Sequence, residues 1–169
     1  MKNKFLFFLF FLLLSKMFFF NANSAEQFSF DVTEIEVLQN GNIIKGIKKG
    51  SVKTEDGIII NADNFVYEKL LNILTADGKV EIIDANKNLK IYSDNVIYDK
   101  NSEIITTNYN SKAIYEKIKF IKGNKFIFNR NENILNVSGK VEIQDTIKDY
   151  LISGDNFTYY KGNEKIITK

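Results

Sequence analysis

The sequence predicts an all-β protein, a repetitive antiparallel β-jelly-roll or β-solenoid with repeats of about 30 residues. Two observations predict this fold class. Short runs rich in Ile, Val, Phe, Tyr and Thr alternate with Asn, Asp, Gly and Lys at about the spacing expected of strands and turns. A six-residue motif also returns four times, with starts 31, 30 and 31 residues apart. After residue 25, no stretch keeps an apolar stripe at helical spacing.

The first 25 residues are typical of a secretory signal peptide. Two lysines precede an unbroken apolar run over residues 5–14, and Ala25 offers a cleavage position. A retained membrane anchor is the alternative, but a bilayer needs about 20 apolar residues and Lys16 interrupts the extension of the run. The sequence therefore predicts an exported protein in which residues 26–169 form a single domain.

The charge and composition of the remaining chain exclude several classes of function. The leader holds three of the 23 basic residues and none of the 21 acidic ones, so 20 bases against 21 acids give a net charge of −1. Nucleic-acid-binding proteins carry an excess of positive charge instead. The chain has no His and no Cys, which excludes His-based triads, imidazole or thiolate metal sites and disulfides. Arg130 is the only arginine.

The chain after the leader opens with a strand-like run, residues 28–38, that lies outside the repeat. Its alternation of apolar and polar residues slips near Glu34, which indicates a β-bulge.

Each copy of the repeated motif begins with a small residue followed by Asp or Asn. These pairs are Ala62-Asp63, Ser93-Asp94, Gly123-Asn124 and Gly154-Asp155. Glycine and Asx residues tolerate unusual backbone angles, and Asx side chains can bond their own backbone. We therefore expect a corner at each motif, where a strand passes from one sheet to another.

Two columns of mostly aromatic residues follow the corner at a spacing of two. The columns are Phe65, Val96, Phe126 and Phe157, and then Tyr67, Tyr98, Phe128 and Tyr159. Residues two apart on a strand share a face, so both columns should point inward. They line an apolar groove in one interpretation and form ordinary core packing in the other.

A second motif, Gly-Lys-Val-Glu-Ile, lies between the corners at residues 78–82 and 139–143. Four acidic residues sit at matching positions of these two copies: Glu81, Asp84, Glu142 and Asp145. We expect these acids on a solvated outer face with the lysines. Catalytic residues should occur at one place in the chain, whereas these acids recur at the same positions of both copies. The sequence thus predicts no catalytic residue, no metal and no cofactor. The aspartates at the corners supply one carboxylate per turn, too few for the six to eight oxygens of calcium.

Together these motifs resemble the OstA-like repeat of the lipopolysaccharide-transport family, which includes the periplasmic bridge protein LptA and the N-terminal domain of the outer-membrane protein LptD. The resemblance rests on the order small-Asp-x-(Phe/Val)-x-Tyr, an apolar strand, and Gly-(Lys/Asn)-Val-x-Ile, and it covers residues 28–169. It implies an open, twisted β-jelly-roll (a β-taco) in the periplasm or at the outer membrane. It also implies that the aromatic columns shield lipid acyl chains.

The resemblance further implies like-folded partners joined edge to edge. The fourth repeat reaches its aromatic strand and then a short strand-like run consisting of Lys165, Ile166, Ile167 and Thr168. We expect this run to be an edge strand that docks a partner through backbone pairing. A free bridge protein and a fragment of a larger outer-membrane translocon both remain open. A structural or adhesive β-solenoid with a closed core and no ligand is the alternative function.

Overall fold

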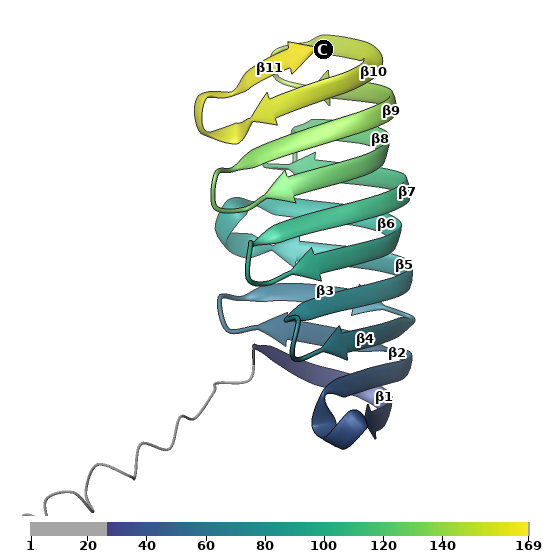
Figure 1. Ribbon diagram of the computed structural model, residues 1–169. Helices are drawn as coiled ribbons and strands as arrows, with labels where there is room; N and C mark the ends of the chain where they lie inside the picture. Colours follow the sequence, from purple (N-terminus) through teal and green to yellow (C-terminus); the bar gives the residue numbers. More distant parts are fainter. Residues whose placement is uncertain (1–26, 169) are drawn as a thin grey trace, which may run out of the picture.

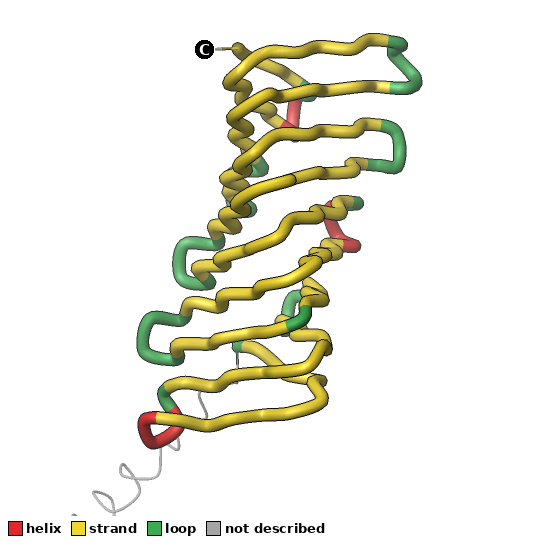
Figure 2. Tube along the Cα trace, turned by 90° about the vertical axis from the view of Figure 1, so that its right-hand side faces the viewer, coloured by secondary structure: helices red, strands yellow, loops and turns green. Residues whose placement is uncertain are grey.

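The computed structural model describes residues 27–168, and this part of the chain folds into one antiparallel sheet of 11 strands (Figure 1). The predicted all-β class is confirmed, and strand dominates the trace in Figure 2. The predicted leader, residues 1–25, lies outside the described residues. The strands are β1 (Phe28–Leu38), β2 (Ile43–Thr54), β3 (Ile58–Ala62), β4 (Asn64–Glu68), β5 (Ile73–Asp84), β6 (Leu89–Asp99), β7 (Ile104–Tyr115), β8 (Lys119–Asn129), β9 (Ile134–Asp145), β10 (Tyr150–Tyr160) and β11 (Lys165–Thr168).

The strands stack in the order in which they occur in the chain. β1 pairs with β2, and β5 to β10 each pair with the next strand. β3 and β4 together take the place of one long strand, because both lie between β2 and β5. Short turns connect the strands, three of them 3₁₀ turns named η2 (Gln39–Gly41), η3 (Ala85–Lys87) and η4 (Lys161–Asn163). Each predicted repeat of about 30 residues is therefore one pair of adjacent strands.

Each long strand bends once near its middle. The pairing of neighbouring strands shifts register there, for example between Asp77 and Val80 in β5 and between Tyr92 and Asn95 in β6. The bulge predicted near Glu34 is confirmed by a shift between Val32 and Glu34. The expected passage from one sheet to another is wrong in detail. A single continuous sheet folds over on itself, because a bulge bends each pair of long strands near its middle.

The unusual backbone angles lie beside the predicted corner residues, in the adjacent strand. Gly78 and Gly139 have φ of +82° and +78°. A Cβ on Gly78 would lie 2.6 Å from Asp63 Oδ2, and one on Gly139 would lie 2.7 Å from Asn124 Nδ2. In these two repeats the Asp63 or Asn124 side chain thus packs closely against a backbone position that has no Cβ.

The small residue of the corner motif serves packing. Gly123 and Gly154 have no positive φ, contrary to the backbone reason expected for them. A Cβ on Gly154 would lie 2.9 Å from the Phe157 ring, and one on Gly123 would lie 3.3 Å from Phe126 and 2.6 Å from Val137. These glycines leave the space into which the aromatic ring of the same repeat folds.

The bend divides the inward side chains of every strand into two sets, which form two walls. One set contains the two aromatic columns, which lie after the corner in β4, β6, β8 and β10. It also contains the residues paired with the second column on the neighbouring strands, Leu74, Ile105 and Leu135. We call it the aromatic wall. The other set, the aliphatic wall, consists of Val52, Ile60, Val80, Ile82, Ile91, Ala113, Ile121, Val141 and Ile143. All belong to one apolar cluster.

Candidate functional site

The two predicted columns line the interior of the folded sheet. All eight residues are buried, with exposed fractions between 0% and 6%: Phe65, Tyr67, Val96, Tyr98, Phe126, Phe128, Phe157 and Tyr159. Their neighbours in the strand point the other way, since Ile97 and Ile127 are each 37% exposed. The inward orientation follows from the alternation of side chains along a strand. A lipid-binding role for these residues stays a prediction.

The rings contact one another most closely at the β1 end of the stack. Phe28 lies 4.8 Å from Tyr67 and 5.9 Å from Tyr98, measured between ring centroids, with edge-to-face geometry. Phe30 packs on Phe65 in the same way at 6.3 Å. Such pairs stabilise a core by about 0.5–1.5 kcal/mol beyond the burial of their area.

The strand ends of the two walls meet at a long polar mouth opposite the bend. The turns 55–57, 85–88, 116–118 and 146–149 end the aliphatic wall, and we call them the aliphatic rim. The turns 69–72, 100–103, 130–133 and 161–164 end the aromatic wall and form the aromatic rim. Side chains bridge the two rims at several levels of the stack.

Arg130, on the aromatic rim, is the centre of the largest bridge. Its guanidinium lies 2.8 Å from Asp56 Oδ2 and 3.2 Å from Asp84 Oδ2, and both acids end the aliphatic wall. It also pairs with Glu103 and donates a hydrogen bond to the Tyr98 hydroxyl at 3.0 Å. Lys100 joins the cluster through Asp56 at 3.4 Å. A single arginine therefore pairs with acids from two turns and from the end of β5.

A second bridge lies further along the mouth. The Lys119 ammonium is 3.6 Å from the carboxylate of Asp145 and donates to the Tyr159 hydroxyl at 3.0 Å. Lys161 of the aromatic rim donates to the carbonyl of Lys87 across the mouth at 2.9 Å and lies 4.2 Å from the centre of the Tyr115 ring. Burial lowers the pKa of Lys161 to about 8. Among the described residues, no buried side-chain nitrogen or oxygen lacks a hydrogen-bond partner.

These bridges correct the expectation that the matched acids lie on the outer face. Asp84 and Asp145 are 3% and 2% exposed, whereas the side chains of Glu81 and Glu142 are 28% and 53% exposed. The alternation explains the difference, because Asp84 stands two residues after inward-facing Ile82. Lys119 is likewise buried, at 2%, contrary to the expectation for lysines. Period-two spacing from the apolar residues was the signal that could have revealed these inward charges.

Acid should weaken the Arg130 cluster. Burial alone would raise the pKa of Asp56, but hydrogen bonds from Thr54 and Arg130, and the charges of Arg130 and Lys100, lower it to about 2. A carboxylate with a lowered pKa stabilises the fold above its ordinary pKa near 4, and this contribution is lost as the pH falls towards 2. We expect a loss of about 1 kcal/mol, reduced by solvent screening because Asp56 is 40% exposed.

The measurement is the free energy of unfolding between pH 6 and pH 2, compared for the wild type and Asp56→Asn. The variant should lose less stability than the wild type over this range. Equal losses in the two proteins would contradict the expected role of Asp56.

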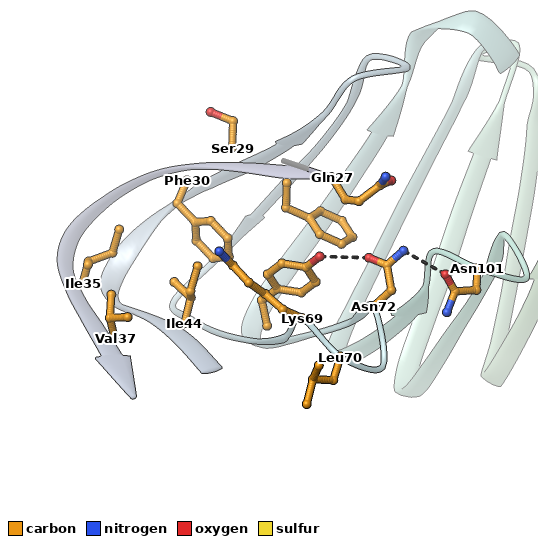
Figure 3. Close-up of a pocket in the computed structure, with 12 residues that line it drawn as sticks. Gln27, Ser29, Phe30, Ile35, Val37, Ile44, Lys69, Leu70, Asn72 and Asn101 are labelled. Atoms are coloured by element: carbon orange, nitrogen blue, oxygen red, sulfur yellow. Dashed lines mark hydrogen bonds between the residues drawn. The ribbon is translucent and has the colours of Figure 1, made fainter. Parts of the chain in front are cut away.

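The two ends of the stack differ in shape. β11 pairs with only the last part of β10, from Phe157 to Tyr160, and it is the last strand of the sheet within the described residues. The predicted docking residues Lys165, Ile166, Ile167 and Thr168 therefore form an edge strand, while their contact with a partner stays a prediction. At the other end, β1 borders a hollow of about 640 Å³ (Figure 3).

Apolar side chains from β1 and β2 lie around this hollow beside a polar chain of hydrogen bonds. Ile35 and Val37 are 53% and 58% exposed there. The Tyr67 hydroxyl donates to Asn72 at 2.9 Å, and Asn72 donates to Asn101 at 2.9 Å (Figure 3). Both ends of the stack thus carry an edge strand, and the β1 end adds exposed apolar area.

Within residues 27–168, no group of three acidic side chains is arranged to hold a metal ion. In the same part of the chain, no helix is long and apolar enough to cross a bilayer.

Comparison with known proteins identifies the fold. No protein-family model matches the chain, and no curated protein matches its sequence. The chain is similar in structure to LptH from Pseudomonas aeruginosa, described as the LptA-homologous periplasmic component of the lipopolysaccharide transport device. The TM-score is 0.61 and the sequence identity is 13%, over 69% of this chain and 92% of LptH. The described part of the chain therefore has the LptA-like β-jelly-roll fold.

Proposed function

We propose that this protein is a non-enzymatic member of the OstA-like lipopolysaccharide-transport family that carries lipid acyl chains through the periplasm. The observation that supports the proposal is the apolar interior, which continues along the stack between the aromatic and aliphatic walls. The similar fold of LptH supports the same assignment. The leader would direct export and be cleaved after Ala25, and residues 26–169 would form the working domain.

Acyl chains need apolar area and no polar chemistry, so a continuous apolar interior suits them. Lipid would pass between the walls from one end of the stack to the other without a covalent step. A groove at equilibrium only lowers the barrier to this movement, so its direction would depend on energy supplied by another protein. Like-folded domains at the two edges would extend the path.

Photo-crosslinking tests whether the aromatic wall faces lipid. A photoreactive residue is placed singly at Phe65, Tyr98, Phe126 or Phe157, and the protein is purified from a Gram-negative host after irradiation. We expect adducts with lipopolysaccharide from these positions, because their side chains point between the walls.

Matched controls come from neighbouring positions whose side chains point away from the walls: Val66, Ile97 and Ile127. These positions should give few adducts. Equal labelling of both sets, or no labelling of either, would overturn the groove.

The edge strand β11 should mediate head-to-tail association or pairing with a like-folded partner. Its backbone groups on the side away from β10 have no strand partner among the described residues. Replacing Ile166 by proline removes a backbone donor and distorts the edge strand. We expect the mass measured by light scattering to grow with concentration in the wild type and to stay that of a monomer in Ile166→Pro.

A second variant, Ile35→Asp on β1, leaves the β11 edge intact and tests the other end, because head-to-tail association would bring the β11 edge of one copy to the β1 end of the next. A wild type that is monomeric at every concentration and binds no like-folded domain would contradict edge pairing.

A structural β-solenoid with a closed core is the second candidate, and the near-complete burial of both walls favours it. Purification from a Gram-negative membrane extract separates the two functions. A carrier should retain lipopolysaccharide, and a structural solenoid should not.

A further inference from the structure

The interior offers an acyl chain no room unless the two walls move apart. The side chains of both walls are buried, and they belong to one packed cluster. The bend holds the walls together through continuous backbone on one side. The walls can therefore separate only at the mouth, where the two rims meet.

Polar contacts hold the mouth closed. Asp56 and Asp84 stand at the end of the aliphatic wall, and Arg130 reaches both of them from the aromatic rim at 2.8 Å and 3.2 Å. Lys100 adds a second contact from the same rim to Asp56. Further along the mouth, Lys87 of the aliphatic rim donates a hydrogen bond to Asn133 of the aromatic rim. Lys148 of the aliphatic rim likewise forms an ion pair with Glu164 of the aromatic rim. Contacts of this kind join residues up to 74 positions apart in sequence.

We propose that the cluster of Arg130, Asp56, Asp84, Lys100 and Glu103 is a latch that keeps the mouth shut, and that it must open for an acyl chain to enter. The inference rests on the proposed lipid-carrying function and adds the step that controls access to the interior. The Tyr98 hydroxyl, which accepts from Arg130 at 3.0 Å, ties the latch to the aromatic wall.

An ionic latch suits a mouth that must open and close. The attraction between buried charges is offset by the cost of removing them from water, and opening the mouth returns their hydration. Apolar side chains at the mouth would gain no comparable hydration free energy on opening, because their exposure to water is unfavourable. The carboxylates of Asp56 and Asp84 lie on one side of the mouth, and the cations of Lys100 and Arg130 lie on the other side together with Glu103.

The first experiment measures binding of fluorescently labelled lipopolysaccharide to the purified exported protein. Arg130→Met removes the central cation and leaves Asp84 and Glu103 without it, so the mouth should open more often. We expect the apparent affinity to rise about tenfold, because affinity scales with the population of the open form. Lys122→Met is the matched control, since the Lys122–Glu142 pair at 3.2 Å is exposed and bridges no rims.

The second experiment locks the mouth and does not depend on how well Arg130→Met folds. The chain has no cysteine, so the double variant Lys87→Cys and Asn133→Cys carries the only two thiols. A bismaleimide with an internal disulfide would then link the rims where Lys87 and Asn133 are in contact. We expect binding to fall at least about tenfold when the rims are bridged and to return after reduction. The same variant treated with N-ethylmaleimide is the unbridged control.

The outcomes separate the latch from the lipid-carrying function. Unchanged binding in the bridged protein overturns the latch, whatever Arg130→Met does. If the wild type binds lipopolysaccharide and neither Arg130→Met nor the bridge changes the affinity, the carrier function is retained and the latch is overturned. No binding in the wild type, Arg130→Met or the unbridged control overturns the carrier function itself.

Discussion

Replacing Phe126 by alanine should lower the free energy of unfolding by about 3–5 kcal/mol. Phe126 is fully buried in the aromatic wall, and its ring fills the space left by Gly123. Removing the ring loses its burial and leaves a cavity that the continuous sheet cannot easily close, because backbone pairing fixes the strands on both sides. Chemical denaturation of the purified protein measures the change.

Ile127→Ala is the matched control for this substitution. Ile127 is the next residue on β8, but it points outward and is 37% exposed, so we expect a loss of about 1 kcal/mol or less. A Phe126→Ala loss as small as that of Ile127→Ala would show that the wall is loosely packed in solution. That result would favour an open groove rather than a closed core.

Arg130→Met should destabilise the protein to a similar extent, by about 3–5 kcal/mol, because it leaves buried carboxylates without their cation. Arg130 is 7% exposed, and the carboxylate of Asp84 beside it is 4% exposed. The comparison is Lys122→Met on the outer face, where loss of an exposed pair should cost about 1 kcal/mol or less.

A double substitution separates the pair from the packing of the arginine side chain. Arg130→Met combined with Asp84→Leu replaces a buried charge pair by apolar groups, which is often close to neutral. The double variant should therefore be more stable than Arg130→Met alone. The single variant Asp84→Leu completes the comparison. A loss of stability in the double variant equal to the sum of the losses in Arg130→Met and Asp84→Leu would contradict a direct coupling between Arg130 and Asp84.

Much of the fold could be predicted from the sequence because the local pattern and the repeat point to the same answer. Spacing of two placed Phe126 and Phe128 on the inner face, and recurrence of the motif located the bend in the strands that carry it. The reason given for the bend was incomplete, since the glycines with positive φ, Gly78 and Gly139, lie on the neighbouring strand. A single strand cannot reveal such pairing, because it depends on which residue faces which across the sheet.

The polar mouth was harder to predict for a physical reason. Charged residues usually lie in water, so Asp84 and Lys119 were assigned outside despite their spacing from inward apolar neighbours. Their burial depends on partners distant in sequence, since Asp84 is neutralised by Arg130 and Lys119 contacts Tyr159. The predicted lining residues were easier, because apolar alternation alone determines which face they occupy.

The stacking of strands in chain order has a consequence for how the protein is made. Strands that pair with their sequence neighbours form a nearly one-dimensional array, in which each hairpin depends mainly on the ones beside it. Structure can then nucleate in one hairpin and spread to the next as more chain becomes available, with little entropy lost in closing long loops. Such an array can also lengthen or shorten by whole hairpins during evolution, so the distance it spans is set by gene duplication without redesign of its core.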